Sequence, residues 1–254
     1  MALHRFFAEE HTAGPGDGTN VLPLAPSDIH HLRDVLRLVP GDEIVVVDGG
    51  AATVVRLTEI GERVSGEPVG QVAAPRLPRV TLVQALAKGE KMDDVVRQST
   101  ELGVARIVPF AAERSVVRLD AAKAAARVQR WRRIAAEAAK QSQRLELPLV
   151  DEIVEAAGLP ERLKGSVVLV CWEDATGAPG IGSALREAAL SDDTDVAVVV
   201  GPEGGLTADE VSALEEGGAI AVSLGDTVLR TETAGVVATA LAIYERGGLG
   251  ARDD

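Results

Sequence analysis

Two glycine-containing segments near the C-terminus carry the residues best suited to bind a ligand, Gly201–Gly205 (GPEGG) and Leu224–Ala234 (LGDTVLRTETA). Each follows a short, apolar, β-branched stretch, 196–200 or 220–223, and leads into a helical pattern. In open α/β sheets, ligands bind in the loops at the carboxyl ends of strands. Glycine lets backbone N–H groups come close to a ligand because it has no Cβ. We therefore expect the two loops to meet and to form a pocket walled largely by main chain.

Arg230 and Glu232 are the candidate catalytic residues, because they lie where the second loop meets the last helical pattern. A guanidinium there could stabilise a developing anion, and a carboxylate could accept a proton. A carboxylate in the first turn of a helix can also simply complement the helix dipole, so a structural role for Glu232 stays open. Thr207 and Glu210 have the spacing of a capping box and are expected to be structural.

Taken together and in this order, the segments Gly201–Thr207 and Leu224–Ala234 closely resemble the ribosomal RNA small subunit methyltransferase E family, which belongs to the SPOUT superfamily. The resemblance implies an α/β fold whose C-terminal domain combines a parallel sheet with a trefoil knot. It also implies S-adenosylmethionine as the methyl donor, a homodimer, and methylation of N3 of one uridine in 16S rRNA of the small ribosomal subunit. General rules of chain topology argue against a knot, so this expectation comes from the resemblance alone.

The resemblance also gives the residues of both loops candidate roles. Backbone amides would meet the adenine of the donor, with Leu224 and Leu229 covering the ring. Arg230 would stabilise the uracil anion or hold a phosphate, and Glu232 would orient Arg230 or accept the N3 proton. The target uridine would have to be unpaired or flipped out, because N3 lies on its pairing edge. The candidate donor-binding residues are Val200, Gly201, Pro202, Glu203, Gly204, Gly205, Leu224, Gly225, Leu229, Arg230, Thr231, Thr233 and Ala234.

The composition of the 254 residues sets limits on the class of protein. An apolar content of 46% allows a sizeable core, and with only 2% aromatic residues that core must be built from Val, Leu, Ile and Ala. No uninterrupted apolar run approaches the roughly 18 residues of a membrane span, and the N-terminus meets acidic residues too early for a secretory signal. The expectation is a cytoplasmic enzyme with no membrane segment.

Histidine and cysteine usage excludes several hydrolase classes. Cys171 is the only cysteine, in a probable buried strand (167–171), and is expected to be inert core. All four histidines lie within the first 31 residues, so the rest of the chain cannot hold a complete Ser-His-Asp triad or the commonest zinc hydrolase sites. No metal site is expected.

The net charge of −13 is unusual for a nucleic-acid enzyme, so its distribution matters more than its sum. Residues 76–144 hold 15 basic and 7 acidic residues, which makes this segment a basic island in an acidic chain. A helix expected over Ala121–Arg144 carries much of this charge and is a candidate track for an RNA backbone. The alternative is an ordinary solvated helix face.

Changes in pattern divide the chain into two domains. Residues 1–73 combine a helix over 26–38, capped by Ser27 or Asp28, with strands over 43–47, 53–57 and 63–72; they resemble the PUA-like β-barrel of the same family. Residues 74–78 are expected to be a linker. Residues 79–254 alternate strands and helices, beginning with 79–86, 90–102 and 106–110, which predicts a parallel sheet with right-handed crossovers.

The expected partner is 16S rRNA, and the resemblance suggests which residues contact it. Gln98 and Thr227 stand where relatives commonly have basic residues, which puts one RNA contact in doubt. Two other readings stay open: a SPOUT enzyme with another target, such as a ribose 2′-hydroxyl or a tRNA base, and a ribosome-assembly protein without catalysis. For each candidate in the first domain, a solvated surface is an equal alternative. The candidate RNA-binding residues are Arg5, His31, Arg33, Arg37, Lys88, Lys91, Arg114 and Arg144.

Overall fold

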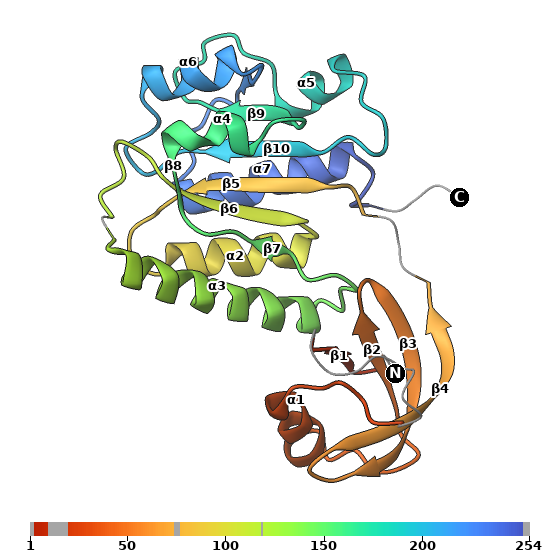
Figure 1. The fold of residues 1–254 in the computed structure, drawn as a ribbon. Coiled ribbons are helices and arrows are strands. Elements are labelled where there is room, and N and C mark those ends of the chain that lie inside the picture. The colour runs from red at the N-terminus through yellow and green to blue at the C-terminus, as the bar shows by residue number, and fades with distance from the viewer. Residues whose placement is uncertain (1–2, 10–19, 74–76, 118, 251–254) are drawn as a thin grey trace. The chain divides into compact units, whose positions relative to one another are not determined.

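The computed structural model describes residues 3–9, 20–73, 77–117 and 119–250 (Figure 1). The chain divides into two compact units, residues 1–75 with 143–146, and residues 76–142 with 147–254. Of the expected linker, residues 74–76 lie outside the described part of the chain. Residues 143–146 were expected in the second domain, but they belong to the first unit. There Leu145 packs against Val45, Val47 and Ala52.

The first unit is a four-stranded sheet in the order β1-β2-β3-β4, with bounds Arg5–Phe7, Glu43–Asp48, Ala51–Ile60 and Val64–Val72. Gly49 and Gly50 both have positive φ in the tight turn between β2 and β3, which is the conformation that glycine adopts without strain. Isolated bridges from Ala8 to Leu24 and from Val21 to Ser65 connect the two edges of the sheet through one short segment.

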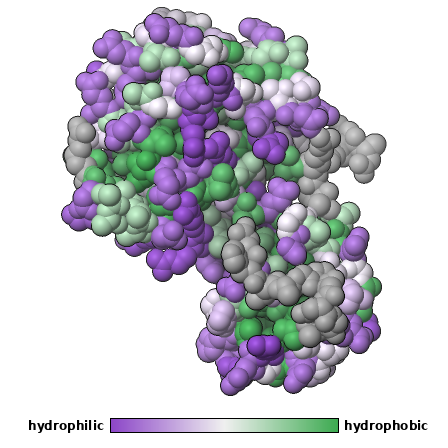
Figure 2. Space-filling view, in the orientation of Figure 1, coloured by the Kyte–Doolittle hydropathy of each residue, from purple (hydrophilic) through white to green (hydrophobic). Residues whose placement is uncertain are grey.

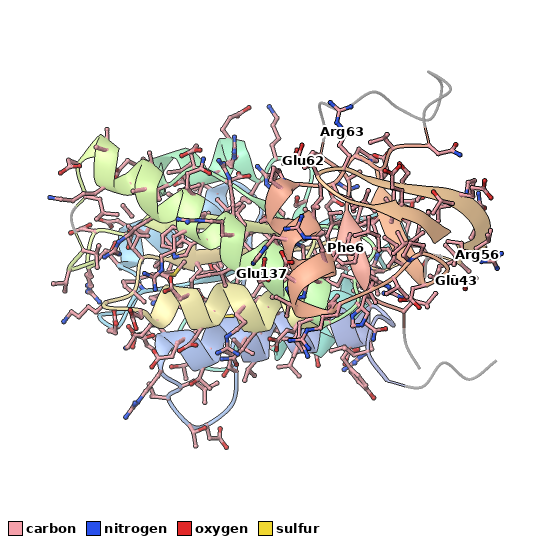
Figure 3. All side chains as sticks on the ribbon, turned by 90° about the horizontal axis from the view of Figure 1, so that it is seen from below. Phe6, Glu43, Arg56, Glu62, Arg63 and Glu137 are labelled. Carbon is pink, nitrogen blue, oxygen red and sulfur yellow. The ribbon has the colours of Figure 1, made fainter. Side chains whose placement is uncertain are left out.

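Side chains of the first unit alternate between core and surface as the pleat requires. Phe6, Ile44, Leu57 and other apolar side chains form its buried core. On the outer face, Arg56 and Glu43 occupy opposite positions of β3 and β2 and pair at 2.9 Å, side by side in Figure 3. Such a pair orders the strand edge but adds little stability because both side chains are well exposed.

The helix of the first unit differs from its expected form. It comprises α1 (Pro26–His30) and a π-helical turn over His31–Val35. Neither Ser27 nor Asp28 caps it: the N-cap is Ala25, without a side-chain hydrogen bond, and Pro26 opens the helix, where its missing N–H is not needed. The helical pattern ends before Leu38, because Arg37 has a φ of 54°.

The second unit has a parallel sheet in the order β11-β9-β10-β5-β6-β7, with the short β8 pairing β6 (Figure 1). Expected strands at 79–86, 106–110 and 167–171 are confirmed with small shifts in their ends. The strand bounds are Val80–Ala85 (β5), Arg106–Ala111 (β6), Leu149–Val150 (β7), Val154–Glu155 (β8), Val167–Cys171 (β9), Val196–Val200 (β10) and Ile220–Val222 (β11).

Helices cover both faces of this sheet. One face packs against α2 (Lys91–Leu102), α3 (Ala121–Gln141), α5 (Ile181–Glu187) and α7 (Thr231–Glu245). The other packs against α4 (Leu159–Arg162), which follows a 3₁₀ turn, and α6 (Ala208–Glu216). Helix α3 ends at Gln141, three residues before its expected end. Figure 2 shows hydrophilic side chains over much of the visible surface with apolar ones between them, while the core residues of both clusters are buried.

Period-two alternation explains how β10 serves both layers. Val196, Val198 and Val200 lie in the core on the α7 side, whereas Ala197 and Val199 lie in the core on the α6 side. All five residues are buried, as expected for a central strand of a parallel sheet covered on both faces. The carboxyl ends of β9, β10 and β11 therefore meet at one edge, where the two glycine-containing loops begin.

Candidate active site

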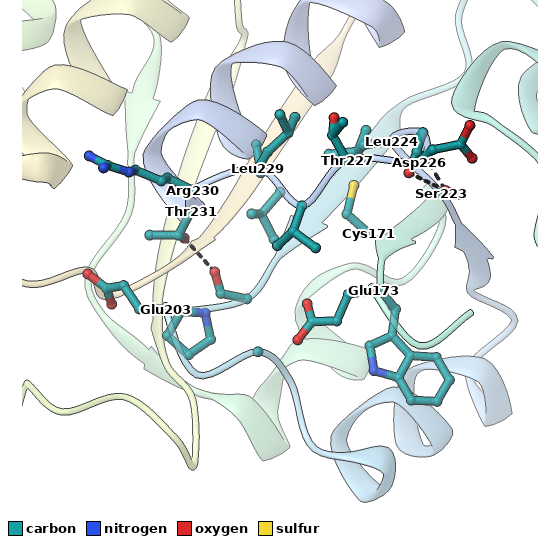
Figure 4. A pocket seen from close by; sticks show the side chains of 18 of the residues that line it. Cys171, Glu173, Glu203, Ser223, Leu224, Asp226, Thr227, Leu229, Arg230 and Thr231 are labelled. Carbon is teal, nitrogen blue, oxygen red and sulfur yellow. Dashed lines mark hydrogen bonds between the residues drawn. The ribbon is translucent and has the colours of Figure 1, made fainter. Parts of the chain in front are cut away.

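A pocket of about 540 Å³ lies at this edge, where β9, β10 and β11 end (Figure 4). Its walls come from three loops: 171–173 after β9, 200–205 after β10, and 223–231 between β11 and α7. Every candidate donor-binding residue lines it except Gly204 and Thr233. The expectation that the two glycine-containing loops meet is therefore confirmed, and the pocket has the size of a typical small-molecule site.

A chain of hydrogen bonds ties the two loops together below the pocket. The Gln84 side chain at the end of β5 donates to Thr231 Oγ1 at 2.9 Å, and Thr231 Oγ1 donates to the carbonyl of Gly201 at 2.5 Å. Gln84 is completely buried, and Thr231 nearly so. The start of α7 and the loop after β10 are thus fixed against the central strand of the sheet.

The adjacent glycines of the first loop have different surroundings. Gly205 has a φ of 71°, and a Cβ built there would overlap the carboxylate of Glu173 in the pocket wall. Gly204 instead faces Arg114, whose Nη1 donates to the Gly204 carbonyl at 3.1 Å. The prediction that Gly204 lines the pocket was therefore wrong, and Gly205 is the glycine whose missing side chain keeps the space open.

Arg230 and Glu232 lie next to each other in the chain but have different partners. Arg230 lines the pocket at the N-cap of α7 and is exposed, and its side chain makes no hydrogen bond or ion pair within the described residues. The Glu232 carboxylate pairs with Lys91 Nζ at 3.1 Å. Glu232 therefore does not orient Arg230 in this structure, contrary to one of its two expected roles.

Several pocket residues were missed in the sequence. Cys171, Trp172 and Glu173 follow β9, and Ser223, Asp226, Thr227 and Val228 complete the second loop. Cys171 lines the pocket instead of lying only in the core, but burial raises the pKa of its thiol to about 12, so the thiol stays neutral. The parallel order of β9 and β10 is the signal that could have found Glu173, because their ends share one edge.

Three of the candidate RNA-binding residues of the second unit surround the first loop. Lys88 is exposed and its backbone N–H donates to Glu203 Oε1 at 3.1 Å; Lys91 Nζ pairs with the same oxygen at 2.9 Å. Arg114 holds the loop from its other side, through the Gly204 carbonyl. Arg144, which belongs to the first unit, is only 7% exposed, and burial lowers its pKa to about 10, so its guanidinium is not presented to an RNA backbone here.

The candidates in the first unit lie on or near its surface. His31, Arg33 and Arg37 are exposed, whereas Arg5 is half-buried and has its pKa lowered by that burial. Arg33 binds the Asp34 carboxylate at 2.8 Å, and its hydrogen bond is the main cause of the lowered pKa of Asp34. These positions are compatible with RNA contact, which stays a prediction.

Several cations of the basic island form ion pairs within the protein. On α3, Arg130 pairs with Asp93, and Arg132 pairs with Glu152 at 2.9 Å. Arg106 binds the buried Asp151 at 2.6 Å, and Arg162 binds the same carboxylate. Arg130 and Arg132 are therefore engaged with carboxylates, whereas Arg127 and Arg133 of α3 form no ion pair within the described residues, so the role of this helix as an RNA track stays a prediction.

The described residues contain no group of three or more His, Cys, Asp or Glu side chains that could hold a metal ion. A search of the same residues for a helix long and apolar enough to span a membrane found none.

Comparison with known proteins matches both units to described families. Residues 75–243 match an RNA methyltransferase domain, and residues 24–63 match an RNA methyltransferase PUA domain. A ribosomal RNA small subunit methyltransferase E of Mycobacterium tuberculosis is 35% identical over 216 residues, 82% of this chain and 80% of that protein. The same enzyme of Bacillus subtilis is 34% identical over 224 residues, 86% and 88% of the two chains.

Solved structures agree with this comparison. The crystal structure of a ribosomal RNA small subunit methyltransferase E from Neisseria gonorrhoeae bound to S-adenosyl methionine has a TM-score of 0.78 and 31% identity, covering 94% of this chain and 96% of that one. A putative methyltransferase of Legionella pneumophila in complex with the same cofactor has a TM-score of 0.79 and 26% identity, covering 95% and 97%.

The fold and the matched domains define the class of this protein: an RNA methyltransferase in which a PUA domain accompanies an α/β domain with a mostly parallel sheet. Identity above 30% over more than four-fifths of the chain narrows the class further. The chain belongs to the ribosomal RNA small subunit methyltransferase E family.

Proposed function

We propose that this protein transfers a methyl group from S-adenosylmethionine to N3 of a uridine in 16S rRNA of the small ribosomal subunit. The observation that carries the proposal is the pocket at the ends of β9, β10 and β11, where the two family motifs meet. The relative from Neisseria gonorrhoeae binds S-adenosyl methionine within a similar fold. Because its substrate is part of the ribosome, we place the enzyme in the cytoplasm.

The pocket fits the donor in size and charge. Its volume of about 540 Å³ suits a nucleoside with an amino-acid side arm, and Gly205 keeps its wall free of a side chain. Leu224 and Leu229 offer apolar cover for a purine ring. The carboxylate of Glu173 points into the pocket (Figure 4), where it suits a donor that carries a sulfonium and an ammonium group.

Arg230 and Glu232 would supply the proton transfer and charge stabilisation that the donor does not provide. A sulfonium methyl group is already activated, so the protein has chiefly to align the two reactants and to manage one proton. As the new N–C bond forms, the N3 proton must leave, and negative charge grows on the uracil ring. Glu232, which pairs with the pocket-lining Lys91, would accept that proton, and the guanidinium of Arg230, which lines the pocket, would stabilise the charge.

Exposed cations around the mouth would hold the RNA. Lys88 and Arg114 flank the Gly201–Gly205 loop, and Arg230 stands at the start of α7. Phosphate contacts of this kind position the substrate without reading its sequence. His31, Arg33 and Arg37 of the PUA domain add exposed positive or titratable groups for the same purpose.

We further propose that the path of the C-terminal segment is the trefoil knot of the SPOUT superfamily. Strand β11 lies at the edge of the sheet beside β9, whereas α7 packs against α2, β5 and β10. The chain between them must return across the carboxyl ends of β9 and β10, where Thr231 is bound to Gly201. A connection that crosses the end of the sheet and is bound to the loop after β10 supports a knotted path.

A homodimer is proposed from the surface of α7. Leu241 and Tyr244, one turn apart, are 40% and 61% exposed, and Val228 in the preceding loop is 87% exposed. Large apolar side chains on one face of a helix are typical of a surface that another chain covers. A second copy of this protein is the occupant that its family implies.

The roles of Arg230 and Glu232 are tested by separating donor binding from chemistry. We expect Arg230→Ala and Glu232→Gln to bind S-adenosylmethionine with parental affinity in calorimetry but to lose roughly 100-fold or more in methyl transfer to 16S rRNA. Arg230→Ala removes a lining side chain and Glu232 does not line the pocket, so neither change should close it. Transfer at the parental rate in both variants would show that the assignment is wrong.

A further inference from the structure

Lys91 holds two carboxylates that the sequence places far apart. Its Nζ lies 2.9 Å from Glu203 Oε1 and 3.1 Å from Glu232 Oε2. Glu203 belongs to the loop after β10, and Glu232 to the first turn of α7. One ammonium group therefore connects the start of α2, the donor loop and the helix that carries the candidate base.

The position of Lys91 in its own helix is unfavourable unless the ammonium is paired. Lys91 is the first residue of α2, where the helix dipole favours negative charge and disfavours a lysine. Glu232, in the first turn of α7, is favoured by the dipole of that helix. Helices α2 and α7 pack together. The N-termini of α2 and α7 thus both lie at this cluster of Lys91, Glu203 and Glu232. The ammonium group of Lys91 offsets the repulsion between the two carboxylates.

The charges of the cluster stabilise one another. Hydrogen bonds to Glu203 and then Glu232 raise the pKa of Lys91. Burial alone would raise the pKa of Glu203, but hydrogen bonds from Lys91 and from the Lys88 backbone N–H outweigh it, and the pKa is lowered. The three side chains are 33%, 27% and 23% exposed, so they are partly screened by solvent. Both shifts keep Lys91 and Glu203 charged at neutral pH.

This arrangement disagrees with the expected role of Lys91 as an RNA contact. Two of the three ammonium donors already meet carboxylates, and a phosphate would have to approach those same negative charges. The side chains of Lys88 and Arg230 make no ion pair within the described part of the chain and are the better phosphate ligands.

We propose that Lys91 is a positioning residue, which fixes the Glu232 carboxylate beside the donor loop so that this carboxylate can receive the uridine proton. The inference rests on the proposed function of Glu232. Without the ammonium group of Lys91, the carboxylates of Glu203 and Glu232 would repel each other, and the Glu232 side chain would move away from the donor loop. Lys91 then acts on the rate of methyl transfer and not on the affinity for RNA.

The first experiment compares Lys91→Met with Lys88→Met, a matched change in the loop just before α2, in steady-state methylation of 16S rRNA. Losing hydrogen bonds to charged groups lowers kcat of Lys91→Met by roughly 10- to 100-fold. Its KM for RNA and the salt dependence of RNA binding stay at parental values. In Lys88→Met we expect the converse, a raised KM and a shallower salt dependence. Lys91→Arg, which keeps the charge, recovers part of kcat.

The second experiment places Lys91→Met in the Glu232→Gln background. If Lys91 acts through Glu232, the added change costs much less than it does alone, because the group it positions is already gone. An equal loss in both backgrounds, or a shallower salt dependence in Lys91→Met, would overturn the positioning role. Glu232→Gln that transfers methyl groups at the parental rate would instead contradict the proposed function of Glu232 itself.

Discussion

Gly204 and Gly205 show how two identical neighbours carry different constraints. Only Gly205 has a positive φ and a Cβ direction that meets the pocket wall at Glu173. Gly204 has ordinary φ and lies against Arg114, at a distance of 3.2 Å from the position of a Cβ. In the sequence GPEGG the two are interchangeable, because only backbone angles and the direction of the missing side chain separate them.

Substitution of these glycines should therefore have unequal effects. In Gly205→Ala the left-handed backbone costs about 1–2 kcal/mol, and the methyl group displaces Glu173, so we expect the Kd for S-adenosylmethionine to rise roughly tenfold or more. Gly204→Ala is the control, since a shift of a few tenths of an ångström at Arg114 accommodates the methyl group. Equal affinities of the two variants in calorimetry would contradict this account of the pocket.

At the scale of elements, the contact between β5 and α7 sets how closely the helix approaches the sheet. A Cβ at Gly235 would overlap the side-chain oxygen of Gln84, which is completely buried. The same Gln84 donates to Thr231 and so reaches Gly201 at the pocket. Gly235 in α7 and Gln84 in β5 thus form one close contact, in which the missing side chain of the glycine leaves room for the amide. Other small residues along α7 also pack against the sheet.

Gly235→Ala should destabilise the protein although alanine favours helices. Helix propensity alone would add about 1 kcal/mol of stability, but overpacking against Gln84 costs about 1–3 kcal/mol. We expect a lower urea midpoint for Gly235→Ala. Ala240→Gly, on the half-buried side of the same helix, should lose only its propensity. A midpoint for Gly235→Ala above that of the parent would contradict the close contact.

The N-cap of α3 gives a prediction in pH. Asp120 accepts the Lys123 backbone N–H at 2.8 Å, and this bond is the main cause of its lowered pKa. A carboxyl with a lowered native pKa contributes stability above its unfolded pKa of 3.8, and that contribution disappears as pH falls through the native value. Asp120→Ala should therefore lower Tm at pH 7 and have a shrinking effect below pH 3.8. A difference in Tm that is constant with pH would refute the cap.

Local sequence patterns predicted the helices and strands near the site, but they did not predict which side chains of these elements pair with each other. Gly103 ends α2 in a left-handed conformation, and Thr207 and Glu210 form the expected capping box, because both signals act within a few residues. The contact of Lys91 with Glu232 spans 141 positions and depends on how α2 and α7 pack. Similarly, the resemblance led us to expect that Arg144 contacts RNA, and no local pattern could show that Arg144 is buried.

At the scale of the whole molecule, the charge of −13 does not prevent RNA binding, because few cations need to be free. Arg79, Arg97, Arg106 and Arg130 are paired with carboxylates, while Lys88 and Arg230 stand unpaired among the described residues near the pocket. On the proposed function, the RNA interface would centre on the cations near the pocket. Each phosphate contact adds about 0.9 to the slope of log affinity against log salt.

RNA affinity should thus fall only moderately with salt and depend on individual cations near the mouth. We expect Arg230→Ala to reduce the salt slope by about 1, and Arg132→Ala on α3 to leave it unchanged because Arg132 is engaged by Glu152. Filter-binding titrations of 16S rRNA over a range of salt concentrations measure both slopes. A larger loss of slope in Arg132→Ala would move the interface to α3.

The central claim is that this pocket delivers a methyl group to N3 of a uridine in 16S rRNA. The most direct measurement incubates the protein with isotopically labelled S-adenosylmethionine and unmodified 16S rRNA in small subunits, and then identifies the labelled nucleoside by mass spectrometry. We predict labelled 3-methyluridine at one position, which also stops primer extension because N3 lies on the pairing edge. Label on a ribose, on another base or on tRNA alone, or no transfer at all, would contradict the account.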